Sequence, residues 1–195
     1  MKVELCGLPG VGKSTFARAL AERLRIDVIT MSNSRAALVR KHPFAALRAF
    51  PGALSRLGGW VNRSAFTELE SRRILQDAQG PGVVEEGILH EIWRRLVREE
   101  ITHEQWARLL RPSEFVVVML HADNSLIQQR LVGRQANLPL AEALRESPTT
   151  EAIWTSANAH YKRLLSEAER VRTVVHVDHS VPTEEAVGSF LTQIG

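Results

Sequence analysis

The sequence predicts a single α/β domain in three layers, with helices on both faces of a five-stranded parallel sheet. Short apolar runs alternate along the chain with longer amphipathic stretches, which is typical of parallel strands joined by helices. The 195 residues give room for one sizeable core with a lobe inserted into it. Because no repeat, low-complexity tract or linker interrupts the pattern, residues 1–195 are expected to form one domain.

The apolar runs predict the strands. The clearest is Glu114–Leu120, whose letters EFVVVML are apolar almost throughout, as expected for a buried strand. Glu4 is unusual, because it places a charge in a strand that should be central, and the sequence indicates no partner for it. In chain order the predicted strands are Lys2–Cys6, Asp27–Met31, Gly82–Glu86, Glu114–Leu120 and Arg172–Val177.

The stretches between the strands predict the helices. The segment Lys13–Leu24 places Phe16, Leu20 and Leu24 on one face, which is the spacing of an amphipathic helix. Between Ser32 and Gln79 the chain is expected to be largely helical, with breaks at its prolines and its Gly-Gly pair. Further helices are predicted at Leu89–Glu99, His103–Leu110, Ser125–Val132, Leu140–Glu146, Thr149–Arg170 and Thr183–Gln193.

Composition excludes several classes of protein. With 44% hydrophobic and 24% charged residues, the chain is ordinary for a globular domain and is neither disordered nor fibrous. It has no run of 18 apolar residues, so no membrane span is expected. The N-terminal segment reaches glycine and proline before a signal-peptide core could form, and Cys6 alone cannot form an internal disulfide. A cytoplasmic location is therefore the expectation.

A glycine-rich segment lies between the first predicted strand and the first predicted helix. Residues 7–14, GLPGVGKS, match the pattern G-x-x-x-x-G-K-[ST] of phosphate-binding loops, in the strand–loop–helix context that the pattern requires. Gly7, Gly10 and Gly12 allow the backbone to wrap its amides around phosphate oxygens. The helix that begins near Lys13 directs its positive dipole end to the same point. The segment predicts binding of a nucleoside triphosphate.

Three side chains of this segment have expected roles. Lys13 would reach the β- and γ-phosphates, and the Ser14 hydroxyl would bind Mg²⁺. Thr15 is expected to contact the α-phosphate. This loop places the chain among the P-loop NTPases, whose members include motors, GTPases and kinases.

The segment Arg130-Leu-Val-Gly-Arg134, on the helix after the strongest strand, resembles the R-x-x-x-R element that opens the lid of adenylate kinases. The resemblance implies a lid region at about residues 130–150. It also implies that Arg130 stacks on the adenine while Arg134 contacts the phosphates, roles that suit a guanidinium group. Spacing of i, i+4 puts both arginines on one helix face. The alternative is a solvated basic edge of a helix.

The segment Val177–Pro182, before the last helix, resembles the loop that forms the other wall of the adenine pocket in these kinases. It also reads as an ordinary helix start with Thr183 as its cap. No N/T-K-x-D guanine motif is present, so ATP is favoured over GTP. The residues expected to bind the nucleotide are Gly7, Gly10, Val11, Gly12, Lys13, Ser14, Thr15, Arg130 and Pro182.

Together these segments resemble the nucleoside and nucleotide kinases in order along most of the chain, with an adenylate-kinase-like lid and a thymidylate-kinase-like layout. The chain lacks both the D-G-[FY]-P-R segment of adenylate kinases and the D-R-[SYFH] segment of thymidylate kinases. The identity of the acceptor therefore cannot be transferred from these families.

The third predicted strand ends in two carboxylates, Glu85 and Glu86, where the sheet should open beside the γ-phosphate. Phosphoryl transfer needs an acid there, either to orient an acceptor hydroxyl or to hold a magnesium-bound water. Successive strand residues point to opposite faces, so the two cannot do the same job while both are in the strand. We favour Glu85 as the acid near Mg²⁺, with Glu86 as the second candidate and a solvated strand end as the alternative.

The formal net charge is only +3, but the positive charge is concentrated in one segment. Between Asp27 and Glu68 the sequence has no acidic residue and six cationic ones. In this architecture, residues 28–80 would form a helical lobe that binds the acceptor, so an anionic acceptor is expected. A helix with a solvated arginine face would explain the same composition. The candidate acceptor-binding residues are Ser32, Arg35 and Arg72.

The sequence thus predicts a small P-loop kinase that transfers the γ-phosphate of Mg·ATP to a hydroxyl or phosphate of an anionic nucleoside or nucleotide acceptor. Lys13 and Arg134 would neutralise charge on the transferred group. A polynucleotide or DNA-base hydroxyl kinase is an alternative, as is a kinase for another small molecule. A P-loop ATPase without transfer, or a nucleotide-dependent interaction protein, is the alternative from a different class.

Overall fold

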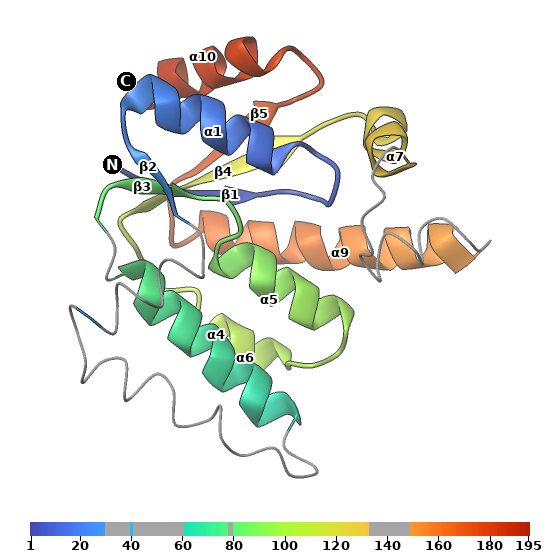
Figure 1. Cartoon of the computed structure of the whole chain (residues 1–195). Helices are drawn as coiled ribbons and strands as arrows, with labels where there is room; N and C mark the ends of the chain where they lie inside the picture. The colour runs from blue at the N-terminus through green and yellow to red at the C-terminus, as the bar shows by residue number, and fades with distance from the viewer. Residues whose placement is uncertain (30–39, 41–60, 78–79, 133–148) are drawn as a thin grey trace.

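Five parallel strands form one sheet in the order β2-β3-β1-β4-β5 (Figure 1). The computed structural model describes residues 1–29, 40, 61–77, 80–132 and 149–195. The prediction of a three-layer α/β fold with a five-stranded parallel sheet is confirmed. The strands are β1 Lys2–Cys6, β2 Asp27–Ile29, β3 Gly82–Val84, β4 Phe115–His121 and β5 Val174–Asp178.

Helices cover both faces of this sheet (Figure 1). Helix α1 (Lys13–Leu24) and helix α10 (Thr183–Ile194) cover one face. The opposite face is covered by α5 (Ile88–Val97) and α9 (Thr149–Glu169), with α4 (Val61–Asp77) and α6 (His103–Ala107) beyond α5. Helix α7 (Asn124–Val132) follows β4. Most of these bounds agree with the predicted helices to within about three residues.

Alternation along the strands divides the interior into two hydrophobic cores. Val3 and Leu5 of β1 are fully buried against α1 and α10, in a core that includes Phe16 and Phe190. Cys6 points to the other side, into a core built around residues such as Trp93. Alternate side chains of β1, the strand at the centre of the sheet, therefore pack into the two cores on opposite faces. This central strand leads directly into the glycine-rich segment.

Strand β3 is shorter than predicted. Its pairing with β1 ends where Glu4 lies opposite Val84, so Glu85 and Glu86 lie beyond the strand, in a turn that leads to α5. Because they lie outside the strand, the side chains of the two acids need not point to opposite faces of the sheet. The predicted helix Leu140–Glu146 and the predicted helices between residues 30 and 60 lie outside the described residues.

Within the described ranges, no helix combines the length and the apolar character needed to cross a membrane.

Candidate functional site

The segment between β1 and α1 forms a compact loop over the carboxyl end of the sheet. Its backbone has positive φ at Gly10 (85°) and Gly12 (103°), a conformation that residues with a side chain rarely adopt. The loop closes through the Val11 N–H, which donates to the Leu8 carbonyl at 3.2 Å. Helix α1 then starts directly, with Gly12 as its left-handed N-cap. The start of a helix carries N–H groups without an intrahelical partner, which is the feature that anion binding at a helix N-terminus uses.

Lys13 is held beneath this loop. Its ammonium group donates to the carbonyl of Gly7 at 2.9 Å and to that of Leu8 at 3.3 Å, and the residue is only 8% exposed. Lys13 thus lies under the glycine loop, and its role with nucleotide phosphates stays a prediction.

Glu85 and Ser14 come together from different elements. The Ser14 hydroxyl, in the first turn of α1, donates to the Glu85 carboxylate in the turn after β3. Hydroxyl and carboxylate oxygens are the ligands that Mg²⁺ prefers, and Mg²⁺ is usually bound through few protein groups together with water and phosphates. This pair fits the predicted magnesium site.

Glu86 turns away from Ser14. Its side chain is 53% exposed, and one of its carboxylate oxygens lies 3.6 Å from Nε2 of the His90 imidazole. The sequence analysis favoured Glu85 over Glu86, and this geometry supports the same order. The catalytic role of either acid stays a prediction.

His90 lies in the first turn of α5 and is 3% exposed, with its ring 5.6 Å from the Trp93 ring. Burial lowers the pKa of His90 well below its usual value, and the positive charge of Lys13 lowers it further. Its Nδ1 has no hydrogen-bond partner among the described residues. His90 is thus a neutral imidazole beside the loop lysine, an environment that its position at the start of a helix does not predict.

Arg130 of α7 and His179 both reach the carbonyl of Val11. Arg130 Nη1 donates to this oxygen at 2.9 Å, and His179 Nδ1 lies 2.7 Å from it. The second Nη of Arg130 is 3.4 Å from the carbonyl of His179 itself. Two distant segments therefore fix the outer side of the loop. The adenine-stacking role of Arg130 stays a prediction.

His179 also explains why residue 12 is glycine. The His179 ring is 2% exposed and its Nε2 lies 3.2 Å from the Thr183 hydroxyl, which holds the ring in place. A Cβ on Gly12 would lie 2.5 Å from His179 Nδ1. The sequence points to the loop Val177–Pro182 but not to His179 itself, because the contact with Val11 joins residues 168 positions apart. Pro182 is exposed at the N-cap of α10.

The buried Glu4 has a partner that the sequence did not indicate. One carboxylate oxygen accepts from the Leu89 N–H at 2.6 Å, and the other lies 3.0 Å from Arg172 Nη1. Both side chains are almost fully buried. A Cβ on Gly87 would overlap the Glu4 side chain, so glycine is required there. Burial raises the pKa of Glu4, while the charge of Arg172 opposes this rise.

The Glu4 carboxylate therefore caps the start of α5 from within the sheet. Gly87, the N-cap of this helix, has no side chain to do so. Because Glu85 comes immediately before this start, the buried ion pair fixes the turn that presents the candidate acid.

Arg72 of α4 is engaged with two carboxylates. Its Nη2 donates to Glu68 at 2.9 Å, and its Nη1 lies 3.6 Å from Glu91 of α5. Its predicted role with the acceptor stays a prediction. Three predicted site residues lie outside the described residues: Ser32, Arg35 and Arg134.

The fold is shared with a solved deoxyadenosine kinase and with the solved YorR protein. A deoxyadenosine kinase from M. mycoides with the product dCMP and a flexible dCDP aligns with a TM-score of 0.62 at 14% identity, covering 100% of this chain and 98% of that one. The same enzyme with dATP gives 0.61 at 14% identity, with 100% and 99% covered. The YorR protein from Bacillus subtilis, in complex with phosphorylated GDP, gives 0.56 at 16%, with 100% and 95% covered.

These similarities establish a P-loop kinase-like fold, and the predicted resemblance to nucleoside and nucleotide kinases is confirmed at that level. No curated protein sequence matches the chain. The family model described as an AAA domain matches residues 3–164, from β1 into α9. On that match, which spans both the phosphate loop and the candidate acids, the chain belongs to the AAA domain family.

Proposed function

We propose that this protein is a kinase that transfers the γ-phosphate of Mg·ATP to a hydroxyl or phosphate of a nucleoside or nucleotide acceptor. The observation that carries the proposal is the contact between Ser14 and Glu85 at the edge of the phosphate loop. It puts a carboxylate beside the residue expected to bind Mg²⁺, which is where an acceptor hydroxyl must be oriented.

The residues around the loop have distinct roles in this proposal. The loop amides and the start of α1 bind the phosphates, while Lys13 leaves its carbonyl partners to neutralise the transferred group. Glu85 accepts the proton of the acceptor hydroxyl or holds a water in the magnesium shell. Mg²⁺, when bound through Ser14, supplies charge neutralisation between the phosphates. Arg130 donates to the Val11 carbonyl and so helps to hold the loop in its conformation.

The acceptor class follows from two considerations. The deoxyadenosine kinase that shares the fold was solved with dCMP and with dATP, and YorR with phosphorylated GDP, so nucleosides and nucleotides are the first compounds to test. The acid-free segment between Asp27 and Glu68 carries six cationic residues, which favours an anionic acceptor. In this proposal Ser32 and Arg35 contact the acceptor, and Arg134 contacts the phosphates.

A label-transfer screen tests the proposal. The protein is incubated with γ-labelled ATP, Mg²⁺ and a panel of nucleosides, nucleotides and oligonucleotides, at low and high salt. Transfer to a nucleoside or nucleotide is expected, and Lys13→Ala should abolish it. Label found only as free phosphate with every acceptor would contradict kinase activity. Transfer restricted to oligonucleotides, and falling steeply with salt, would support the polynucleotide alternative instead.

A further inference from the structure

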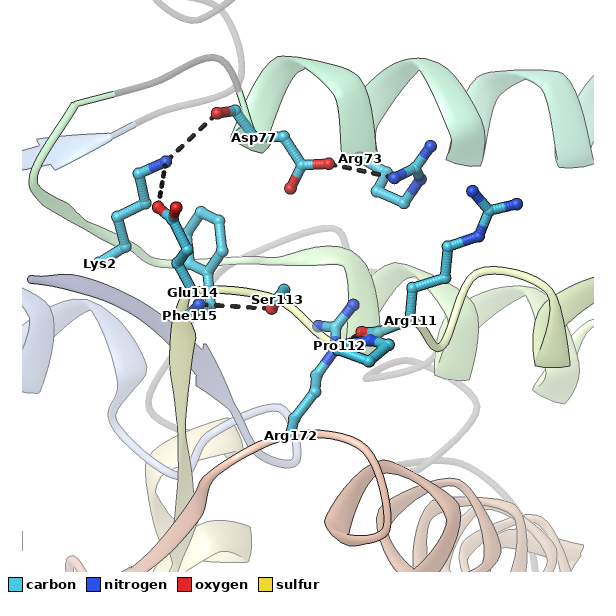
Figure 2. Close-up of a pocket in the computed structure, with 9 residues that line it drawn as sticks. All are labelled: Lys2, Arg73, Asp77, Arg111, Pro112, Ser113, Glu114, Phe115 and Arg172. Carbon is cyan, nitrogen blue, oxygen red and sulfur yellow. Dashed lines mark hydrogen bonds and ion pairs between the residues drawn. The ribbon is translucent and has the colours of Figure 1, made fainter.

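A cavity of about 230 Å³ lies at the amino-terminal edge of the sheet, away from the phosphate loop (Figure 2). It opens where β1 begins at Lys2 and β4 begins at Phe115, and its other walls come from α4, from the segment before β4 and from Arg172 in the turn before β5. The phosphate loop follows the opposite end of β1, roughly 13 Å away at the usual rise of a strand. The cavity is therefore separate from the site described above.

The lining of this cavity is mainly charged, with positive charge in excess. Four cationic and two anionic side chains line it, and the buried Glu4, which is not part of the lining, pairs with one of the cations, Arg172. One full positive charge remains after that pairing. The charged lining residues are Lys2, Arg73, Arg111 and Arg172 on the positive side, and Asp77 and Glu114 on the negative side.

Arg111 carries the uncompensated charge. Lys2 lies 3.3 Å from Glu114, and Arg73 lies 3.1 Å from Asp77. Arg111 donates from Nε to the carbonyl of Arg108 at 3.2 Å, and no carboxylate in the part of the chain that the structure describes pairs with it. Figure 2 shows the guanidinium groups of Arg73 and Arg111 turned to the same side of the cavity.

The polar groups of the cavity suit a phosphoryl anion. Guanidinium groups bind phosphate oxygens in a two-pronged geometry, and two of them near one another favour a ligand with more than one negative charge. The Ser113 hydroxyl accepts from the Phe115 N–H at 3.3 Å, which leaves its own hydrogen for a ligand. The volume equals that of roughly eight liquid water molecules at about 30 Å³ each, enough for a compact anion.

We propose that this cavity binds a compact phosphoryl anion, of the class of pyrophosphate or inorganic phosphate, at a second site independent of the phosphate loop. Arg111 provides the guanidinium group that has no carboxylate partner among the described residues, and Arg73 and Lys2, paired with Asp77 and Glu114, lie beside it in the lining. The proposal does not depend on the kinase activity, since it concerns binding at the other end of the sheet.

Calorimetric titration of the full chain with pyrophosphate at low salt tests this site. The phosphate loop would bind pyrophosphate as well, so the titration is done with Lys13→Ala, in which the loop is disabled. Binding should persist in that variant. Adding Arg111→Gln should weaken it about tenfold or more, because a charge-assisted hydrogen-bond donor is lost. Adding Arg170→Gln, an exposed arginine outside the cavity, should change the affinity less than twofold.

Two results would overturn the proposal. If Lys13→Ala removes all pyrophosphate binding, the phosphate loop is the sole site. If binding persists but neither Arg111→Gln nor the double change Arg73→Gln with Arg111→Gln weakens it, the anion binds elsewhere. Arg111 is exposed and lacks a carboxylate partner among the described residues, so its replacement should leave the fold intact, which circular dichroism checks. Titrations with ATP in the same variants distinguish a free anion from the phosphate tail of a nucleotide.

Discussion

At the scale of single residues, the two adjacent acids after β3 differ most clearly in their surroundings. Glu85 accepts a hydrogen bond from Ser14, whereas Glu86 is 53% exposed and faces His90. We expect Glu85→Gln to lower the transfer rate by about 10²–10⁴-fold, because a positioned proton acceptor is lost. ATP affinity, measured by titration, should change only a few-fold. Glu86→Gln is the matched control and should stay close to the natural protein; the opposite pattern would transfer the catalytic role to Glu86.

Gly12 is a second residue at which a substitution should have a large effect. Its φ of 103° and the His179 ring 2.5 Å from the position of a Cβ both oppose any side chain. Gly12→Ala should therefore weaken ATP binding strongly and lower the melting temperature. Gly188→Ala, in α10, is the control, because a Cβ there meets nothing within 4 Å. That change should stabilise the protein by up to about 1 kcal/mol, as alanine does in a helix. Equal effects of the two changes in thermal melts would contradict this reasoning.

Cys6 is expected to be unreactive in the folded protein. It is 2% exposed, and burial raises the pKa of its thiol to about 12. Thiolate is the reactive form, so an aromatic disulfide reagent at pH 8 should modify Cys6 only after denaturant is added. Rapid modification without denaturant would show that the end of β1, which leads into the phosphate loop, opens readily in solution.

At the scale of elements, the pair of Glu4 and Arg172 joins the central strand to the start of α5. Removal of one member of a buried pair leaves an uncompensated charge, so Arg172→Met should lower the free energy of unfolding by about 3–5 kcal/mol. The double change with Glu4→Gln should cost less than the sum of the single changes, because no buried charge is left alone. Chemical denaturation of the four proteins measures this coupling. Additive effects would mean that the pair contributes no coupling energy.

The elements themselves could largely be predicted from the sequence, because their signals are local. The apolar run of β4 and the spacing of Phe16 and Leu20 in α1 depend only on neighbouring residues. Strand β3 was predicted two residues too long, because sequence alternation does not show where the ladder with β1 ends. The partner of Glu4 could not be predicted, since Arg172 lies 168 positions away and becomes its neighbour only through the fold.

At the scale of the whole molecule, the parallel sheet sets the location of both sites proposed within the described residues. Its carboxyl edge carries the glycine loop, Glu85 and the residues that support them, and its amino edge carries the basic cavity. The phosphate loop could be predicted because its chemistry is encoded in eight consecutive residues. His179 and the cavity around Arg111 could not, because each combines segments that only the order of the strands brings together.

The stability of the whole molecule should depend on pH through His90. Charged groups from several elements face this buried imidazole: Lys13 from α1, Arg72 from α4, Arg94 on its own helix, and the exposed Glu86. Burial is the largest cause that lowers the pKa of His90 in the folded protein, whereas in the unfolded chain it is near 6.5. Between these two values the unfolded chain binds the additional proton, so the free energy of unfolding falls as pH falls below 6.5.

This dependence has a limiting slope of about 1.4 kcal/mol per pH unit for one proton. Urea denaturation at several pH values between 7.5 and 5 should therefore show a decline in the free energy of unfolding that is reduced in His90→Gln. Subtraction of the two curves isolates His90 from other titrating groups, such as Glu4. His103→Gln is the control, because His103 is an exposed histidine at the start of α6. Equal slopes for all three proteins would mean that His90 takes up its proton without loss of stability, and hence that the region between α5 and the phosphate loop opens to admit it.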